Sequence, residues 1–119
     1  MSHGKSQDER FAQMTFATVY PLYLAKVIRK GRTQAELNQI IQWLTGFSEQ
    51  DLVKFIEKKS TFPQFFDAAK LHPNAQKITG LICGYRIEEI ENPLTQKVRY
   101  LDKLVDELAK GKTIEKIFR

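Results

Sequence analysis

The chain has 119 residues, of which 42% are hydrophobic and 28% charged, and its formal net charge is +5. This length predicts a single domain that folds without help from a metal or a disulfide. The one cysteine, Cys83, excludes an intrachain disulfide and favours a reducing compartment, so we expect a cytoplasmic protein. We expect neither a signal peptide nor a membrane anchor, because residues 1–10 are polar and the interrupted apolar stretch 14–28 is too short.

Helix signals begin soon after the start of the chain. We expect residues 1–7 to be disordered, because they are polar and bury nothing, and residues 8–119 to form one helical domain. The first helix is predicted over residues 19–30, with Thr18 as its N-cap so that Pro21 falls in the first turn. Gly31 then ends this helix.

Three capping boxes predict further helix starts. They are Thr33 with Glu36, Ser48 with Asp51, and Thr61 with Gln64. The helix that follows Thr33 has an apolar face and is expected to end at Gly46.

The stretch 75–91 allows two interpretations. Apolar residues on opposite sides of a helical wheel favour a helix buried on both sides, with Gly80 and Gly84 forming a groove where another backbone approaches closely. Its strand-forming residues favour a strand, but clean alternation is missing. We therefore predict an all-α fold, a compact bundle of five to six helices with 75–91 as the buried central helix, in which Gly84→Leu would overpack the contact.

The last long helix is predicted to begin at Asn92, with Pro93 in its first position, and to end at Gly111. Its apolar residues follow a 4-3-4-3 spacing that makes a narrow seam. The seam consists of Leu94, Val98, Leu101, Val105 and Leu108. Such a seam either packs inside the chain or pairs with a second copy. Residues 113–119 are expected to return to the core as a short turn.

Motifs for known chemistry are missing from the sequence. It has no phosphate loop, no dinucleotide glycine pattern and no pair of cysteines. Cys83 with His72 is a weak candidate for a nucleophile and its base, because a lone cysteine in an apolar segment is usually inert core. Glu88, Glu89 and Glu91 have no histidine at ligand spacing. We therefore expect no catalytic residue, no metal and no cofactor.

Aromatic residues and one arginine are the best binding candidates. The set is Tyr20, Tyr23, Trp43, Tyr85 and Arg86. Tyrosine, tryptophan and arginine are typical of binding hot spots, but the same residues also fill gaps between helices with their polar tips in water.

Basic residues gather near two expected helix C-termini. One cluster is Lys26, Arg29, Lys30 and Arg32, and the other lies within residues 110–119. Cations at these positions complement the helix dipole, and they also form a possible contact with nucleic acid or a small anion.

Several short strings in combination give the chain a family resemblance. They include Val-Tyr-Pro-Leu-Tyr at 19–23, Lys-Gly-Arg-Thr at 30–33, Trp-Leu-Thr-Gly at 43–46, Ile-Cys-Gly-Tyr-Arg at 82–86, Glu-Glu-Ile-Glu at 88–91 and Tyr-Leu-Asp-Lys-Leu at 100–104. With them the chain resembles, from about Glu9 onward, a family of small bacterial proteins known as the domain of unknown function number twenty-two hundred. The resemblance implies a bacterial cytosolic protein and implies no activity.

The leading functional hypothesis is a small non-enzymatic interaction module that binds a protein partner or a second copy of itself, with no role for a membrane. One alternative is nucleic-acid or small-anion binding through the basic helix ends. A third hypothesis is an enzyme that acts on a small anionic substrate at Arg86.

Overall fold

A computed structural model describes residues 6–119, which form seven α-helices, two 3-10 helices and one two-stranded hairpin. The α-helices are α1 (Gln7–Gln13), α2 (Phe16–Arg29), α3 (Gln34–Thr45), α4 (Glu49–Glu57), α5 (Phe62–Ala68), α6 (Pro93–Ala109) and α7 (Ile114–Ile117). Between α5 and α6 lie η1 (Ala75–Lys77), β1 (Leu81–Ile82), β2 (Tyr85–Arg86) and η2 (Ile87–Glu89). The all-α prediction therefore holds broadly, but the described residues contain seven α-helices rather than five to six.

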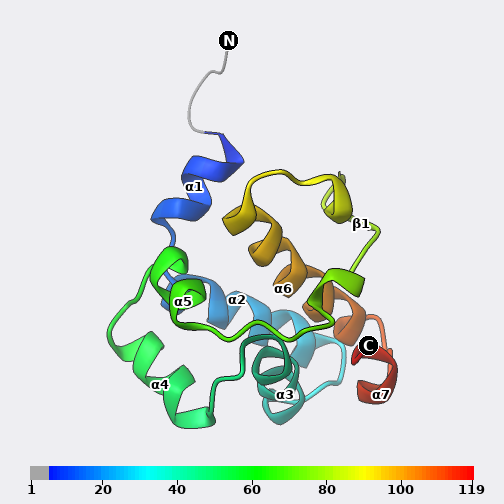
Figure 1. Cartoon of the computed structure of the whole chain (residues 1–119). Coiled ribbons are helices and arrows are strands. Elements are labelled where there is room, and N and C mark those ends of the chain that lie inside the picture. Colours follow the sequence, from blue (N-terminus) through cyan, green and yellow to red (C-terminus); the bar gives the residue numbers. More distant parts are fainter. Residues whose placement is uncertain (1–5) are drawn as a thin grey trace.

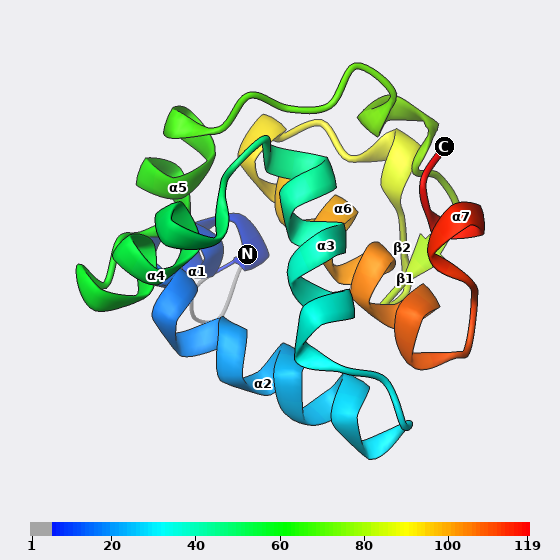
Figure 2. The same cartoon turned by 90° about the horizontal axis from the view of Figure 1, so that it is seen from below.

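α6 is the central helix of the fold. It contacts α1, α2, α3, α5 and α7 as well as the hairpin segment, and it runs through the middle of the molecule in Figures 1 and 2. The seam residues Val98, Leu101, Val105 and Leu108 are buried, and Leu94 packs against the same core. The seam is thus buried inside the chain and is not a surface for pairing with a second copy.

The prediction of a helix over residues 75–91 is wrong. Gly80, Cys83 and Gly84 have φ angles of +99°, +51° and +83°, which a right-handed helix does not allow. Ile82 pairs with Tyr85 in an antiparallel hairpin whose two-residue loop is Cys83-Gly84. Positive φ at both loop residues is the geometry that two-residue hairpins favour. The expected close-packed groove is also absent, because a Cβ on Gly84 would meet no atom within 4 Å.

The predicted caps are confirmed from α3 onward. The boxes at Thr33, Ser48 and Thr61 are formed in full, and Gly46 ends α3 in a left-handed conformation. Asn92 caps α6 by accepting a hydrogen bond from the Thr95 N–H. These side chains satisfy backbone groups that a helix end leaves unpaired, so local sequence alone determines where these helices begin.

The helix predicted over residues 19–30 begins earlier than expected, as α2, and it is preceded by α1, which was not predicted from the sequence. Thr15, not Thr18, caps α2, because Phe16 and Val19 enter the core and draw the helix start forward. Pro21 is consequently inside the helix, at an exposed position. The disorder expected for residues 1–7 falls mostly on residues 1–5, which lie outside the described part of the chain. Ser6 and Gln7, in contrast, form the capped start of α1.

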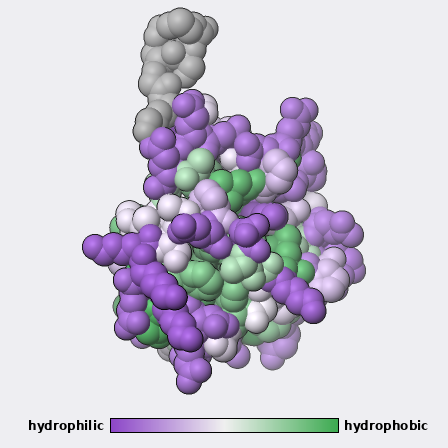
Figure 3. All heavy atoms as spheres, turned by 60° about the vertical axis from the view of Figure 1, so that its left-hand side comes forward, coloured by the Kyte–Doolittle hydropathy of each residue, from purple (hydrophilic) through white to green (hydrophobic). Residues whose placement is uncertain are grey.

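The remaining surface is mixed in character. On the face that carries α1, α4 and α5, hydrophilic side chains border and cross a patch of apolar atoms (Figure 3). Among residues 6–119, none of the helices combines the length and the apolar character needed to cross a membrane. The expected final turn is present as α7, which buries Ile117 and places Phe118 against Trp43.

The hairpin loop yields a prediction that separates backbone strain from overpacking. Gly84→Ala and Gly84→Leu should both destabilise the protein by about 1–2 kcal/mol, because any L side chain is strained at this φ angle. The two variants should be similar, because the space around a Cβ is open. Urea unfolding measures the two destabilisations. If Gly84→Leu costs several kcal/mol more than Gly84→Ala, Gly84 lies in a close-packed groove after all.

Cys83→Asn is the matched control in the same loop. Asparagine tolerates positive φ better than cysteine, and Asn-Gly is a favoured pair for a two-residue hairpin loop. This variant should be as stable as the parent or more stable by a few tenths of a kcal/mol.

Candidate functional site

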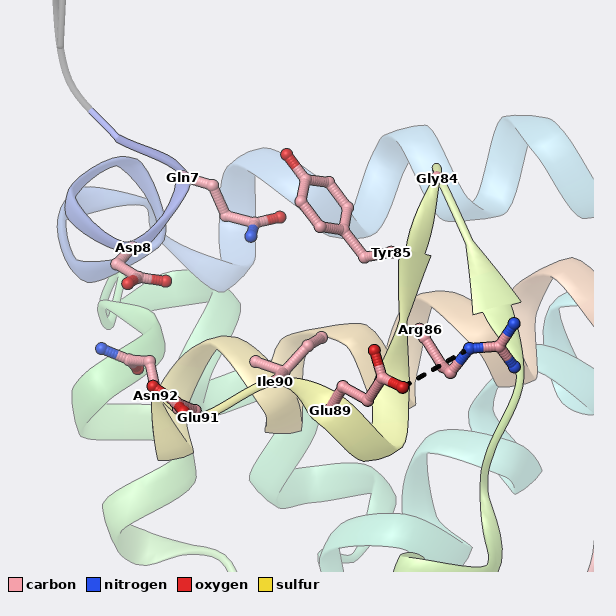
Figure 4. A pocket seen from close by; sticks show the side chains of 9 residues that line it. All are labelled: Gln7, Asp8, Gly84, Tyr85, Arg86, Glu89, Ile90, Glu91 and Asn92. Carbon is pink, nitrogen blue, oxygen red and sulfur yellow. Dashed lines mark ion pairs between the residues drawn. The ribbon is translucent and has the colours of Figure 1, made fainter. Parts of the chain in front are cut away.

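A hollow of about 490 Å³, here called the hairpin groove, opens between α1, the hairpin and the connection into α6. Its lining residues are Gln7, Asp8, Gly84, Tyr85, Arg86, Glu89, Ile90, Glu91 and Asn92. In Figure 4, Gln7 and Tyr85 extend toward each other, whereas Arg86 points away from them and pairs with Glu89. The groove therefore combines an aromatic ring, an amide and several carboxylates from segments far apart in the sequence.

Tyr85 is the largest exposed group of this site. The residue is 42% exposed. One side of the ring packs on the Arg99 guanidinium, whose central carbon lies 5.0 Å from the ring centroid. The same guanidinium lies 5.0 Å from the centroid of Phe11 on α1. Arg99 thus contacts two aromatic rings, and its contact with Tyr85 restrains that ring before any ligand arrives.

Arg99 is only 8% exposed, and hydrogen bonds satisfy its charge. Its Nε donates to Gln7 Oε1 at 3.0 Å, and its Nη1 donates to Asp102 Oδ2 at 2.9 Å. The other Asp102 oxygen accepts a hydrogen bond of 2.5 Å from the Tyr23 hydroxyl. Burial, and then the Asp102 carboxylate, raise the pKa of Tyr23 well above its usual range, so this phenol stays a neutral donor.

The predicted binding residues do not form one site. Tyr85 and Arg86 line the hairpin groove, and Tyr23 lies behind it as a support of Asp102. Tyr20 is buried elsewhere and donates to Asn38 Oδ1 at 2.5 Å. Trp43 stacks on His72 at 4.1 Å between ring centroids and on Phe118 at 5.5 Å.

Sequence reasoning missed Gln7, Asp8, Arg99 and Asp102. The i, i+3 spacing of Arg99 and Asp102 is the one signal they offer, and it is equally typical of a pair on a solvated helix surface. Asp8 lines the groove, and its carboxylate accepts a 2.5 Å hydrogen bond from the Thr95 hydroxyl of α6.

The hairpin groove is acidic, although the chain as a whole is basic. Asp8, Glu89 and Glu91 line it together with a single cation, Arg86. Arg86 Nη1 lies 3.6 Å from Glu88 Oε2, and Arg86 Nε lies 3.8 Å from Glu89 Oε2. The guanidinium therefore already has two carboxylates beside it. This arrangement disfavours an anion at Arg86 and favours a positively charged ligand in the groove.

The basic cluster is divided between structure and surface. The Arg32 guanidinium pairs with Glu36 and donates to the carbonyl oxygens of Leu108 and Lys112 at 3.1 and 2.8 Å. It thereby holds the C-terminal end of α6. Lys26 pairs with Asp106 at 3.3 Å. Arg29 and Lys30 are exposed, and a nucleic-acid contact on this cluster stays a prediction that depends on them.

Cys83, expected in the core, is exposed at the hairpin tip, and the structure places His72 against Trp43 instead. Within residues 6–119, no three acidic, histidine or cysteine side chains gather as a metal site.

Comparisons with known proteins agree with the family resemblance. A family model described as "Uncharacterized protein conserved in bacteria (DUF2200)" matches residues 10–119. A solved structure described as "Crystal structure of uncharacterized protein SP1917" is 44% identical to the chain, covering 97% of this chain and 93% of that one, with a TM-score of 0.86. No curated protein matches the chain at a significant level. Neither description states an activity.

Arg99 should be essential for stability. Arg99→Met keeps an apolar stem but leaves Asp102 without its buried cation and Gln7 without its donor, so we expect a loss of about 3 kcal/mol in urea unfolding. Arg86→Met is the matched control, because its ion pairs are longer and exposed and should be worth under about 1 kcal/mol. Equal effects of the two substitutions would contradict this account of the site.

The Arg32–Glu36 pair gives a pH prediction. The hydrogen bond from Arg32 lowers the pKa of Glu36 from its ordinary 4.5 to about 2. Because the pKa is lower in the folded state, the stabilisation is complete above about pH 4.5 and is lost as the pH falls toward 2. Glu36→Gln should cost about 1 kcal/mol at pH 7, and this difference should vanish near pH 2.

Urea unfolding between pH 7 and pH 2 measures this convergence. Glu57→Gln, which changes an exposed carboxylate on α4, is the matched control and should stay within about 0.5 kcal/mol of the parent at pH 7. A difference between Glu36→Gln and the parent that is constant over this pH range would show that the charge of Glu36 is irrelevant.

Proposed function

Because the chain belongs to the bacterial family DUF2200, whose description states no activity, we propose a function from the site itself. The protein is a non-enzymatic interaction module that binds a basic segment of a partner protein in the hairpin groove. The module works in the cytoplasm, where a reducing environment suits the exposed thiol of Cys83.

The observation that carries this proposal is the restrained, half-exposed ring of Tyr85 beside the carboxylates of the groove. A tyrosine offers a large contact area, and one that is already fixed by Arg99 loses little conformational entropy on binding. Its exposed ring attracts cations, and a lysine or arginine side chain that packs on it lies beside the carboxylates of the groove.

The distribution of charge supports a basic partner over an anionic one. Asp8, Glu89 and Glu91 outnumber the single cation of the groove, and Arg86 is directed to its neighbouring carboxylates. Complementary charge accelerates encounter and orients the partner. The exposed cations Arg29 and Lys30 lie at the end of α2, outside the lining of the groove.

Two other hypotheses, self-association through the seam of α6 and an enzyme site at Arg86, receive less support. Self-association through the apolar seam of α6 has no exposed surface to use, because the seam is buried within the chain. An enzyme acting on a small anion at Arg86 would place that anion among Glu88, Glu89 and Glu91. A basic segment meets neither obstacle.

A nitrogen-15 NMR titration tests the proposal. A lysine- and arginine-rich peptide should shift the amide signals of residues 84–92 together with those of Gln7 and Asp8. Tyr85→Ala should weaken this binding at least about tenfold, because hot-spot truncations cost more than 1 kcal/mol. High salt should weaken it further, because the groove charges are exposed.

Two controls make the titration specific. A peptide with glutamate in place of the basic residues should produce no shifts in the groove. Leu81→Ala, which removes an exposed side chain on the same hairpin but outside the groove lining, should bind the basic peptide like the parent. The proposal is wrong if the groove signals do not move, or if Tyr85→Ala binds as tightly as the parent.

A further inference from the structure

We propose that α1 is a reversible latch, a helix that detaches from α6 while the rest of the protein stays folded. Its detachment removes one wall of the hairpin groove. The opening itself is a property of the fold, whereas its role in controlling binding rests on the proposed function of the groove.

α1 has little apolar area to hold it in place. None of its seven residues is buried, and only Phe11 and the following Met14 pack partly against the core. A helix of this length does not persist alone in water. Contacts with the rest of the fold therefore determine whether α1 exists as a helix, and few of them are hydrophobic.

α1 contacts α5 and α6, and three of its side chains are held by two residues of α6. Gln7 accepts hydrogen bonds from Arg99, Phe11 packs on the same guanidinium, and Asp8 accepts from Thr95, one helical turn away. Because these three attachments lie on one turn of α6, loss of the first weakens the others. We expect α1 to attach and detach as a unit.

Hydrogen bonds hold the chain in place immediately after α1, and they limit how many residues detach. The Met14 carbonyl accepts a 2.9 Å hydrogen bond from the Phe62 N–H, and the Phe16 N–H donates to the Ser60 carbonyl at 2.9 Å. Detachment therefore ends at Met14 and leaves α2 in place. The charge of Arg99 stays neutralised after α1 detaches, because Arg99 keeps its ion pair with Asp102 and its contact with Tyr85.

Detachment changes the groove directly. Gln7 and Asp8 form its α1 wall and supply one of its three lining carboxylates. A basic segment in the groove is thus bound best when α1 is attached. By reciprocal linkage, a bound segment must also hold α1 in place, and any factor that releases α1 must weaken binding.

Hydrogen exchange of the full chain tests the latch without a partner. The amides of α1 should exchange more slowly than those of a free peptide of its sequence, but at least about 100-fold faster than those of α6. Gln7→Ala removes the hydrogen bonds from Arg99 and should accelerate exchange of α1 about another tenfold, with no change in α6.

Asn74→Ala is the matched control. It removes a comparable amide hydrogen bond, which Asn74 Nδ2 donates to the Arg119 carbonyl at 2.8 Å, and it should leave exchange of α1 unchanged. Exchange of α1 and α6 at one common rate overturns the latch, because both would then open only by global unfolding.

Addition of a lysine- and arginine-rich peptide separates the latch from the proposed function. Binding at the groove should slow exchange of α1, as linkage requires. Groove binding with unaltered exchange of α1 overturns the regulatory role and leaves the proposed function intact. Fast exchange of α1 without any peptide binding supports the opening and contradicts the proposed function.

Discussion

The buried Arg99 guanidinium is the interaction on which the candidate site depends. A charge with so little access to water must be paired and hydrogen-bonded, or it costs several kcal/mol. Asp102 supplies the counter-charge and Gln7 an acceptor, while the rings of Phe11 and Tyr85 both pack on the guanidinium. One residue of α6 thereby attaches both α1 and the hairpin to the central helix.

This arrangement explains why the groove is found where it is. The hairpin and α1 have few buried residues of their own, and each contacts α6. Because both settle beside the same guanidinium, they leave the hairpin groove between them and hold Tyr85 at its edge. The restraint that stabilises the fold also prepares the ring for a ligand, and the loosely buried α1 is the part that is able to leave.

Local chemistry made the helix starts predictable, and tertiary packing decided the rest. Capping at Thr33 and Asn92 follows from side chains that bond the nearest backbone groups. The sequence does not reveal the hairpin, because Gly80 and Gly84 also fit a helix as small residues, whereas the fold uses them for positive φ angles. Local rules favour a helix that has Pro21 in its first turn. α2 begins five residues before Pro21, at Phe16, because burial of the Phe16 ring outweighs this local preference.

The site was predictable only where residue type is enough, because its other residues are brought together by tertiary packing. Tyr85 and Arg86 were identified from residue type alone, but the importance of Arg99 depends on two distant segments that fold over it.

A double-mutant cycle between Arg99→Met and Tyr85→Ala tests most directly whether Arg99 organises the site. If the guanidinium holds the ring, the two substitutions are coupled, and the cycle in urea unfolding gives an interaction free energy of about 0.5–1 kcal/mol or more. Strictly additive effects would contradict the account, because the hairpin would then be held in place without Arg99.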